Sequence, residues 1–76
     1  MRAATYEFRV LGRLDAETLA ELTDLEVREQ GDETVLTGVV VDQAALHGVI
    51  ARLEAIGVHL VEVRLRPPDD AAGRPA

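Results

Sequence analysis

The clearest pattern in the chain is a helical repeat of hydrophobic residues over residues 41–57, VDQAALHGVIARLEAIG. At 100° per residue its larger apolar side chains fall on one side: Leu46, Val49, Ile50 and Leu53. Asp42 precedes them as an N-cap, and Gly57 follows them as a residue that readily takes the left-handed conformation of a helix C-terminus. The pattern predicts a helix of about four turns with one face on a core.

Four other segments alternate between apolar and polar residues, which is typical of strands buried on one face. They are residues 4–11, 25–30, 33–41 and 58–66. Gly31-Asp32 joins the second to the third as a two-residue hairpin turn, and the resulting register places Gly38 on the inner face opposite Leu25. In the last segment Val61, Val63 and Leu65 are expected to face inward, and Leu60, Glu62 and Arg64 outward.

A short helix is predicted between the first two strands, with Asp15 as its N-cap and its end near Leu22. The resulting order predicts an α+β, ferredoxin-like (βαββαβ) fold, in which a four-stranded antiparallel sheet of order 4-1-3-2 carries two helices on one face. Residues 1–66 are expected to form this single domain. Residues 67–76, which begin with two prolines and have no apolar periodicity, are expected to be a disordered tail.

Composition narrows the classes of function. Hydrophobic residues make up 47% of the 76-residue chain with only one Tyr and one Phe, so the core is expected to be aliphatic. A net charge of −6 argues against nucleic-acid and anionic-membrane binding, both of which need clustered basic residues. The absence of cysteine excludes disulfides and thiolate chemistry. No leader-like or membrane-spanning apolar stretch is seen, so a cytoplasmic location is expected.

Candidate chemistry is limited to two histidines, His47 on the flank of the main helix and His59 at the start of the last strand. Neither has an acidic residue at the spacing of a known motif, and no nucleophile, phosphate-loop or zinc-protease motif occurs. The expectation is therefore no catalytic residues, no metal site and no cofactor. The open alternative is a very small enzyme that uses His47 or His59.

The residues TVLTG (34–38), DQA (42–44) and LHG (46–48) lie within one stretch from the third strand to the last. This stretch resembles a group of small uncharacterised bacterial proteins, over roughly half the chain, and the resemblance implies a free-standing domain of the same fold. Among well-known families of this fold, regulatory amino-acid-binding (ACT) domains are similar in size. Their Asp-x-Pro-Gly turn is replaced here by VLGRLD.

Two surfaces are candidates for association. With the first and third strands taken as parallel neighbours, Leu11, Val39 and Leu60 are expected to meet as an apolar patch on the uncovered sheet face. The outer face of the main helix is small rather than charged, and consists of Ala44, Gly48, Ala51 and Ala55. Strand propensity and helix propensity are the alternative explanations of these two features.

The leading hypothesis is a non-catalytic protein-interaction or self-associating domain, expected to form a homodimer or to bind a protein partner, because a domain this small has a marginal core. A small-molecule-binding regulatory module of the ACT type is the first alternative. The small enzyme, acting at a dimer interface, is the second.

Overall fold

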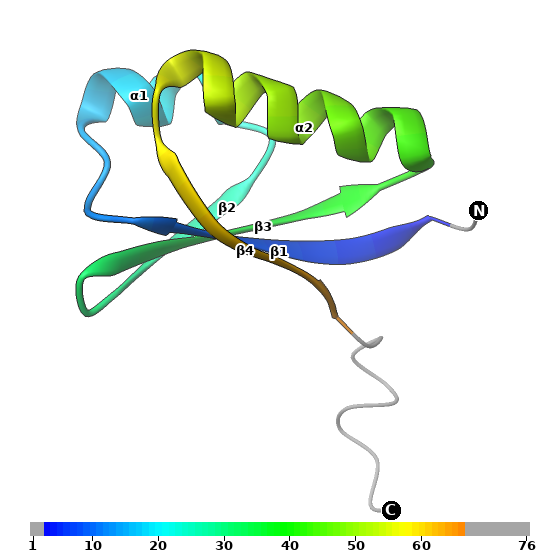
Figure 1. Cartoon of the computed structure of the whole chain (residues 1–76), viewed down its shortest axis with the longest axis horizontal. Helices are drawn as coiled ribbons and strands as arrows, with labels where there is room; N and C mark the ends of the chain where they lie inside the picture. The colour runs from blue at the N-terminus through cyan, green and yellow to red at the C-terminus, as the bar shows by residue number, and fades with distance from the viewer. Residues whose placement is uncertain (1–2, 67–76) are drawn as a thin grey trace, which may run out of the picture.

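The computed structural model describes residues 3–66, and the predicted tail at 67–76 lies outside this range. Four strands and two helices follow one another in the order β-α-β-β-α-β (Figure 1). Their bounds are β1 (Ala4–Leu11), α1 (Ala16–Ala20), β2 (Glu26–Gln30), β3 (Glu33–Val40), α2 (Gln43–Ile56) and β4 (His59–Arg66). Each predicted element is present, although α1 ends two residues earlier than expected and continues as a turn.

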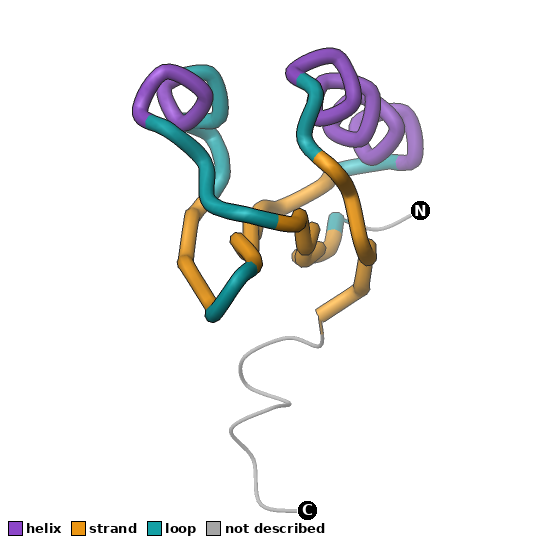
Figure 2. The backbone as a smooth tube through the Cα atoms, turned by 60° about the vertical axis from the view of Figure 1, so that its left-hand side comes forward, coloured by secondary structure: helices purple, strands orange, loops and turns teal. Residues whose placement is uncertain are grey.

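The four strands form one sheet in the order β2-β3-β1-β4, and every neighbouring pair is antiparallel. This is the predicted order 4-1-3-2, read from the other edge. Both helices lie on the same side of the sheet, so no element of residues 3–66 covers the opposite face, called the uncovered face below (Figure 2). The molecule is therefore a two-layer α+β domain over the described residues.

The expectation that the first and third strands run parallel is wrong, because β1 and β3 pair antiparallel, from Ala4 opposite Val40 to Leu11 opposite Glu33. The connection through α1 returns the chain so that β2 runs in the direction of β1. The tight hairpin then reverses β3. Two successive connections thus set the direction of β3 relative to β1.

The hairpin between β2 and β3 has the predicted turn and register. Gly31 has a φ of 61°, as the first turn position requires, and Val27 lies opposite Leu36. The prediction for Gly38 is also confirmed, because a Cβ atom at this position would run into the Leu25 side chain. Gly38 therefore makes room for Leu25 to pack against the sheet.

Local capping defines both helices. The carboxylates of Asp15 and Asp42 each accept a hydrogen bond at 2.8 Å from the backbone N–H three residues later in the chain. At the other end of α2, Gly57 has a φ of 95° and its N–H donates to the carbonyl of Leu53. The Val58 N–H donates to the same carbonyl at 3.3 Å. The main helix therefore begins and ends where its sequence predicts.

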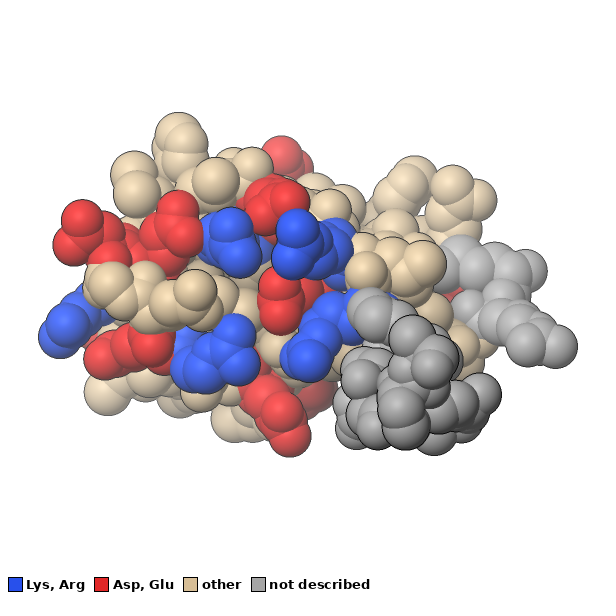
Figure 3. All heavy atoms as spheres, turned by 90° about the horizontal axis from the view of Figure 1, so that it is seen from below, with Lys and Arg blue, Asp and Glu red and all other residues tan. Residues whose placement is uncertain are grey.

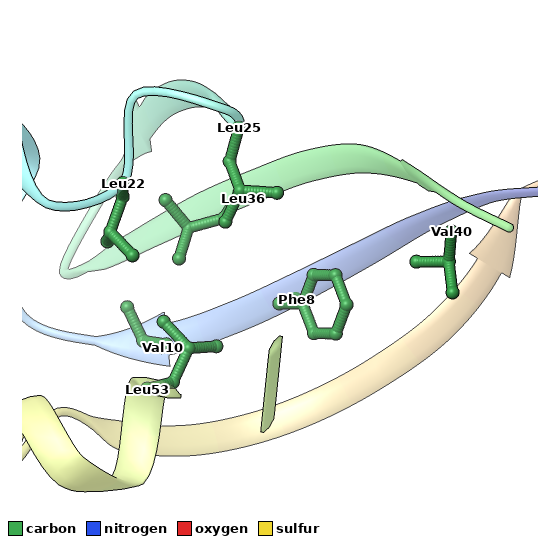
Figure 4. Close-up of a cluster of buried hydrophobic side chains, with 7 residues drawn as sticks. All are labelled: Phe8, Val10, Leu22, Leu25, Leu36, Val40 and Leu53. Carbon is green, nitrogen blue, oxygen red and sulfur yellow. The ribbon is translucent and has the colours of Figure 1, made fainter. Parts of the chain in front are cut away.

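The core lies between the helices and the sheet (Figure 4). Its buried members come from five of the six elements or their flanking turns: Phe8, Val10, Leu22, Leu25, Leu36, Val40 and Leu53. Leu53 is fully buried, and Leu46, Val49 and Ile50 of the same helix pack half-buried around this cluster. The predicted inner face of α2 is confirmed.

β4 contains an irregularity that the sequence pattern did not predict. Arg9 lies opposite Glu62, but the next residue of β1, Val10, lies opposite Leu60, so Val61 is an extra residue in a β-bulge. Leu60 consequently packs against the core, whereas Val61 is 47% exposed. The expected outward orientation is therefore wrong for Leu60, whereas the expected inward orientation holds for Val63, which packs against the core. Val61 and Leu65 have the phase of Val63, but they are exposed at the edge of the sheet.

Candidate interaction surfaces

Side chains of both charges are spread over the face of the sheet opposite the helices, with uncharged residues between them (Figure 3). Successive residues of a strand point to opposite faces, so the residues between the core residues belong to this face. They include four positively and four negatively charged residues: Arg9, Arg28, Arg64, Arg66, Glu7, Glu26, Glu33 and Glu62. The formal charge of this face is thus zero, although the chain carries −6. The excess of acidic residues lies elsewhere in the chain, for example in and directly after α1, at Glu17, Glu21 and Asp24.

Arg9 is at the centre of this charged face. Its Nη1 lies 3.1 Å from Glu62 Oε1, and its Nε lies 3.4 Å from Glu33 Oε1. The Nε atom is buried and makes no hydrogen bond within residues 3–66. At one end of the face, Arg66 Nε lies 3.8 Å from Oε2 of Glu7, a residue only 9% exposed. Neighbouring charges on this face therefore neutralise one another.

Val35 is buried beneath these charged side chains, on the side of the sheet away from the core. It is 1% exposed, yet it does not belong to the core cluster. In the register, Arg9 lies opposite Val35 on one side and Arg28 on the other. Side chains directly opposite on one face are neighbours, and the arginine stems are apolar. We attribute the burial of Val35 to cover by these two stems.

The predicted apolar patch does not form. Leu11 lies opposite Glu33 at one end of the sheet, and Val39 lies opposite Thr5 at the other end. The bulge turns Leu60 to the core side. The predicted meeting of Leu11, Val39 and Leu60 is therefore wrong, because it assumed parallel strands and an unbroken alternation in β4.

The small face of α2 is present as predicted. Ala44, Gly48, Ala51 and Ala55 are all exposed. A Cβ atom at Gly48 would meet nothing within 4 Å among the described residues, so this glycine does not serve a close approach within the chain. Whether this face binds another chain stays a prediction.

The two edges of the sheet, β2 and β4, carry backbone groups that point away from their neighbours. The Gly12 N–H donates to the Asp32 carbonyl, so the even-numbered residues of β1 exchange hydrogen bonds with β3. The odd-numbered residues of β1 then bond to their partners in β4, such as Arg64 opposite Glu7. The N–H and C=O groups of Val63 and Leu65 therefore point outward from the edge of β4, which no other strand of residues 3–66 covers.

β4 also carries two of the exposed large hydrophobic residues, Val61 at 47% and Leu65 at 57% exposure. An edge strand with unpaired backbone groups and exposed apolar side chains is able to pair with another strand. The hydrophobic pattern did not indicate this edge, because alternation assigns residues to the faces of a strand and not to its hydrogen-bonding edges. Apolar residues on a strand that the predicted order places at an edge of the sheet could have indicated it.

The two histidines lie on different elements of the structure. His47 lies exposed on α2, and His59 lies exposed at the start of β4, opposite Leu11. Within residues 3–66, no three histidine or acidic side chains are placed to hold a metal ion. Helix capping, through the backbone hydrogen bond from Thr18, lowers the pKa of Asp15 below its ordinary value.

Asp24 forms an ion pair that the sequence pattern did not predict. Its Oδ2 accepts a hydrogen bond from Nη2 of Arg52 at 2.9 Å, which joins the turn after α1 to α2. This hydrogen bond lowers the pKa of Asp24 below its ordinary value of 3.8. The pair is an exposed link between the turn after α1 and α2.

None of the described helices has the length and apolar character needed to cross a membrane. No curated protein and no solved structure matches the chain. A family described as a domain of unknown function, DUF8691, matches residues 5–64, from the second residue of β1 into β4. Since this match covers most of the 76 residues, the chain belongs to the family of DUF8691 domains.

Proposed function

We propose that this chain is a ferredoxin-like, non-catalytic domain of the cytoplasm that acts by associating with protein chains, beginning with its own copies. The observation that carries the proposal is the free edge of β4, where outward-pointing backbone groups accompany the exposed side chains of Val61 and Leu65. Backbone pairing and apolar burial at such an edge are the usual means of strand addition. The edge of β4 therefore offers both backbone hydrogen bonds and apolar surface to a partner strand.

The charged face of the sheet is a less favourable contact surface than the edge of β4, which supports the same proposal. Several of its charges are already paired within the chain, for example Arg9 with Glu62 at 3.1 Å. A partner that covered this face would have to desolvate these charges, which offsets much of the gain. Association through the strand edge leaves most of the face in water.

Sedimentation velocity of the full chain over a wide concentration range tests the proposal. The weight-average mass is expected to rise from the monomer towards the dimer as the concentration increases. A wild-type chain that stays monomeric at millimolar concentration contradicts self-association. If a metabolite also raised the melting temperature of that monomer, a small-molecule regulatory module would replace the proposed function.

A further inference from the structure

We infer that β4 pairs antiparallel with β4 of a second copy of this chain, about a two-fold axis at Val63, to form a continuous eight-stranded sheet. This inference rests on the proposed function and names its partner and surface. The evidence is the self-complementary order of residues 61–65, which reads valine, glutamate, valine, arginine, leucine. Rotation about Val63 exchanges the acid with the base and one outer apolar residue with the other.

The backbone of β4 fits this register. Because the groups of Val63 and Leu65 point outward, Val63 is able to exchange two hydrogen bonds with Val63 of the second copy. Leu65 then lies opposite Val61 of the second copy, and the symmetry repeats this pair on the other side of the axis. The bulge lies at one end of the segment, so Glu62–Arg66 remains regular against β1.

The side chains of the uncovered face fit the same register. Glu62 lies opposite Arg64 of the second copy, at the non-hydrogen-bonded positions where side chains approach most closely. Both are available, since the Glu62 side chain is 41% exposed and that of Arg64 is 60% exposed. Glu62 Oε1 binds Arg9 of its own chain, whereas among residues 3–66 Oε2 has only Arg64, at 3.9 Å. The second oxygen is therefore free to receive a closer arginine.

The helix side of the pairing is apolar. Val61 and Leu65, both exposed in the single chain, would cover each other across the axis, and Val63 would meet its own copy. The dimer thus removes from water the two large hydrophobic side chains that the β4 edge leaves bare.

Neighbouring registers place like charges together. An axis at Arg64 sets Arg64 against itself, and an axis at Glu62 sets Glu62 against itself. An axis at Leu65 sets Arg64 against Arg66 twice. Like charges directly opposite on one face are unfavourable, whereas the axis at Val63 gives two opposite-charge pairs and no like pair. The charge order therefore favours the axis at Val63 over the axes at Glu62, Arg64 and Leu65.

The other edge of the sheet provides a matched comparison. β2 carries the same triplet, Glu26-Val27-Arg28, on the same face. Its next pair about Val27 would set Leu25 against Glu29, so that a carboxylate meets an apolar side chain. Leu25 is moreover occupied against Gly38 within its own chain. The apolar flanks of the triplet thus distinguish β4 from β2.

Complementary charge reversals test the inference. Arg64→Glu alone and Glu62→Arg alone each convert both pairs into like-charge pairs, so each variant is expected to raise the dimer dissociation constant roughly tenfold or more. An equimolar mixture restores both opposite-charge pairs in the heterodimer, and its dimer fraction is expected to return towards that of the wild type. Arg28→Glu, with the same charge change on β2, is the control and is expected to dimerise normally.

Each result has a defined meaning in sedimentation equilibrium, with circular dichroism to establish folding of every variant. If Arg64→Glu dimerises as well as the wild type, the β4 register is wrong although self-association stands. If Arg28→Glu alone dissociates the dimer, β2 is the contact and the inference fails. If the wild type is monomeric, the proposed function fails together with it. Should Glu62→Arg not fold, the comparison of Arg64→Glu with Arg28→Glu still decides.

Discussion

Two valines on the uncovered face of β3 are expected to respond very differently to the same substitution. Val35 is 1% exposed beneath arginine stems, whereas Val39, four residues further along the same face, is 70% exposed. Val35→Ala removes two methyl groups at about 0.8 kcal/mol each and leaves part of their volume empty, so we expect a loss of about 2 kcal/mol. Val39→Ala should change the free energy of unfolding by less than about 0.5 kcal/mol.

Thermal and urea unfolding, followed by far-ultraviolet circular dichroism at one protein concentration, measures both values. For a domain of this size, about 2 kcal/mol corresponds to a fall in melting temperature of roughly 8–16 °C. The cost of Val35→Ala should become smaller in an Arg9→Ala background, because that variant already removes one of the stems that cover Val35. Equal costs for Val35→Ala and Val39→Ala would refute the reasoning that arginine stems shield the uncovered face.

Two further predictions concern the helix layer. Leu53→Ala should lower the free energy of unfolding by about 2–5 kcal/mol, because the side chain of Leu53 is fully buried on the inner face of α2. An unchanged urea midpoint would contradict the assigned helix face. The lowered pKa of Asp24 means that its bond with Arg52 stabilises the fold at neutral pH and is lost as the pH falls below 3.8. Asp24→Asn should therefore cost less than about 1 kcal/mol near pH 7 and nothing in strong acid, and a constant difference across that pH range in urea unfolding would contradict the assignment.

Features that depend on neighbouring residues could be predicted from the sequence. Asp42 and Gly57 mark the ends of α2 because capping is a local interaction, and the two-residue turn at Gly31 sets the register of the hairpin. The inner face of α2 followed from its period. These elements with the order of connections are sufficient to predict the arrangement of the sheet.

The bulge at Val61 could not be predicted, because Leu60 and Val61 are consecutive apolar residues and either phase of alternation satisfies the core. The burial of Val35 also escaped prediction, since it depends on arginines in two other strands. The direction of β3 relative to β1 was predictable from the hairpin, and the error there led to the misplaced patch of Leu11, Val39 and Leu60. Contacts between residues far apart in the sequence therefore limited the prediction of the interaction surfaces more than the prediction of the fold.

Amide hydrogen exchange in β4 tests most directly the claim that its free edge pairs with a second copy. In the wild type, the amides of Val63 and Leu65 are expected to gain protection as the protein concentration rises, because their N–H groups enter the dimer sheet. The Glu62 amide, which points to β1, serves as the internal control and should stay protected at every concentration. Rapid exchange at Val63 and Leu65 in concentrated protein, beside a protected Glu62, would contradict the claim.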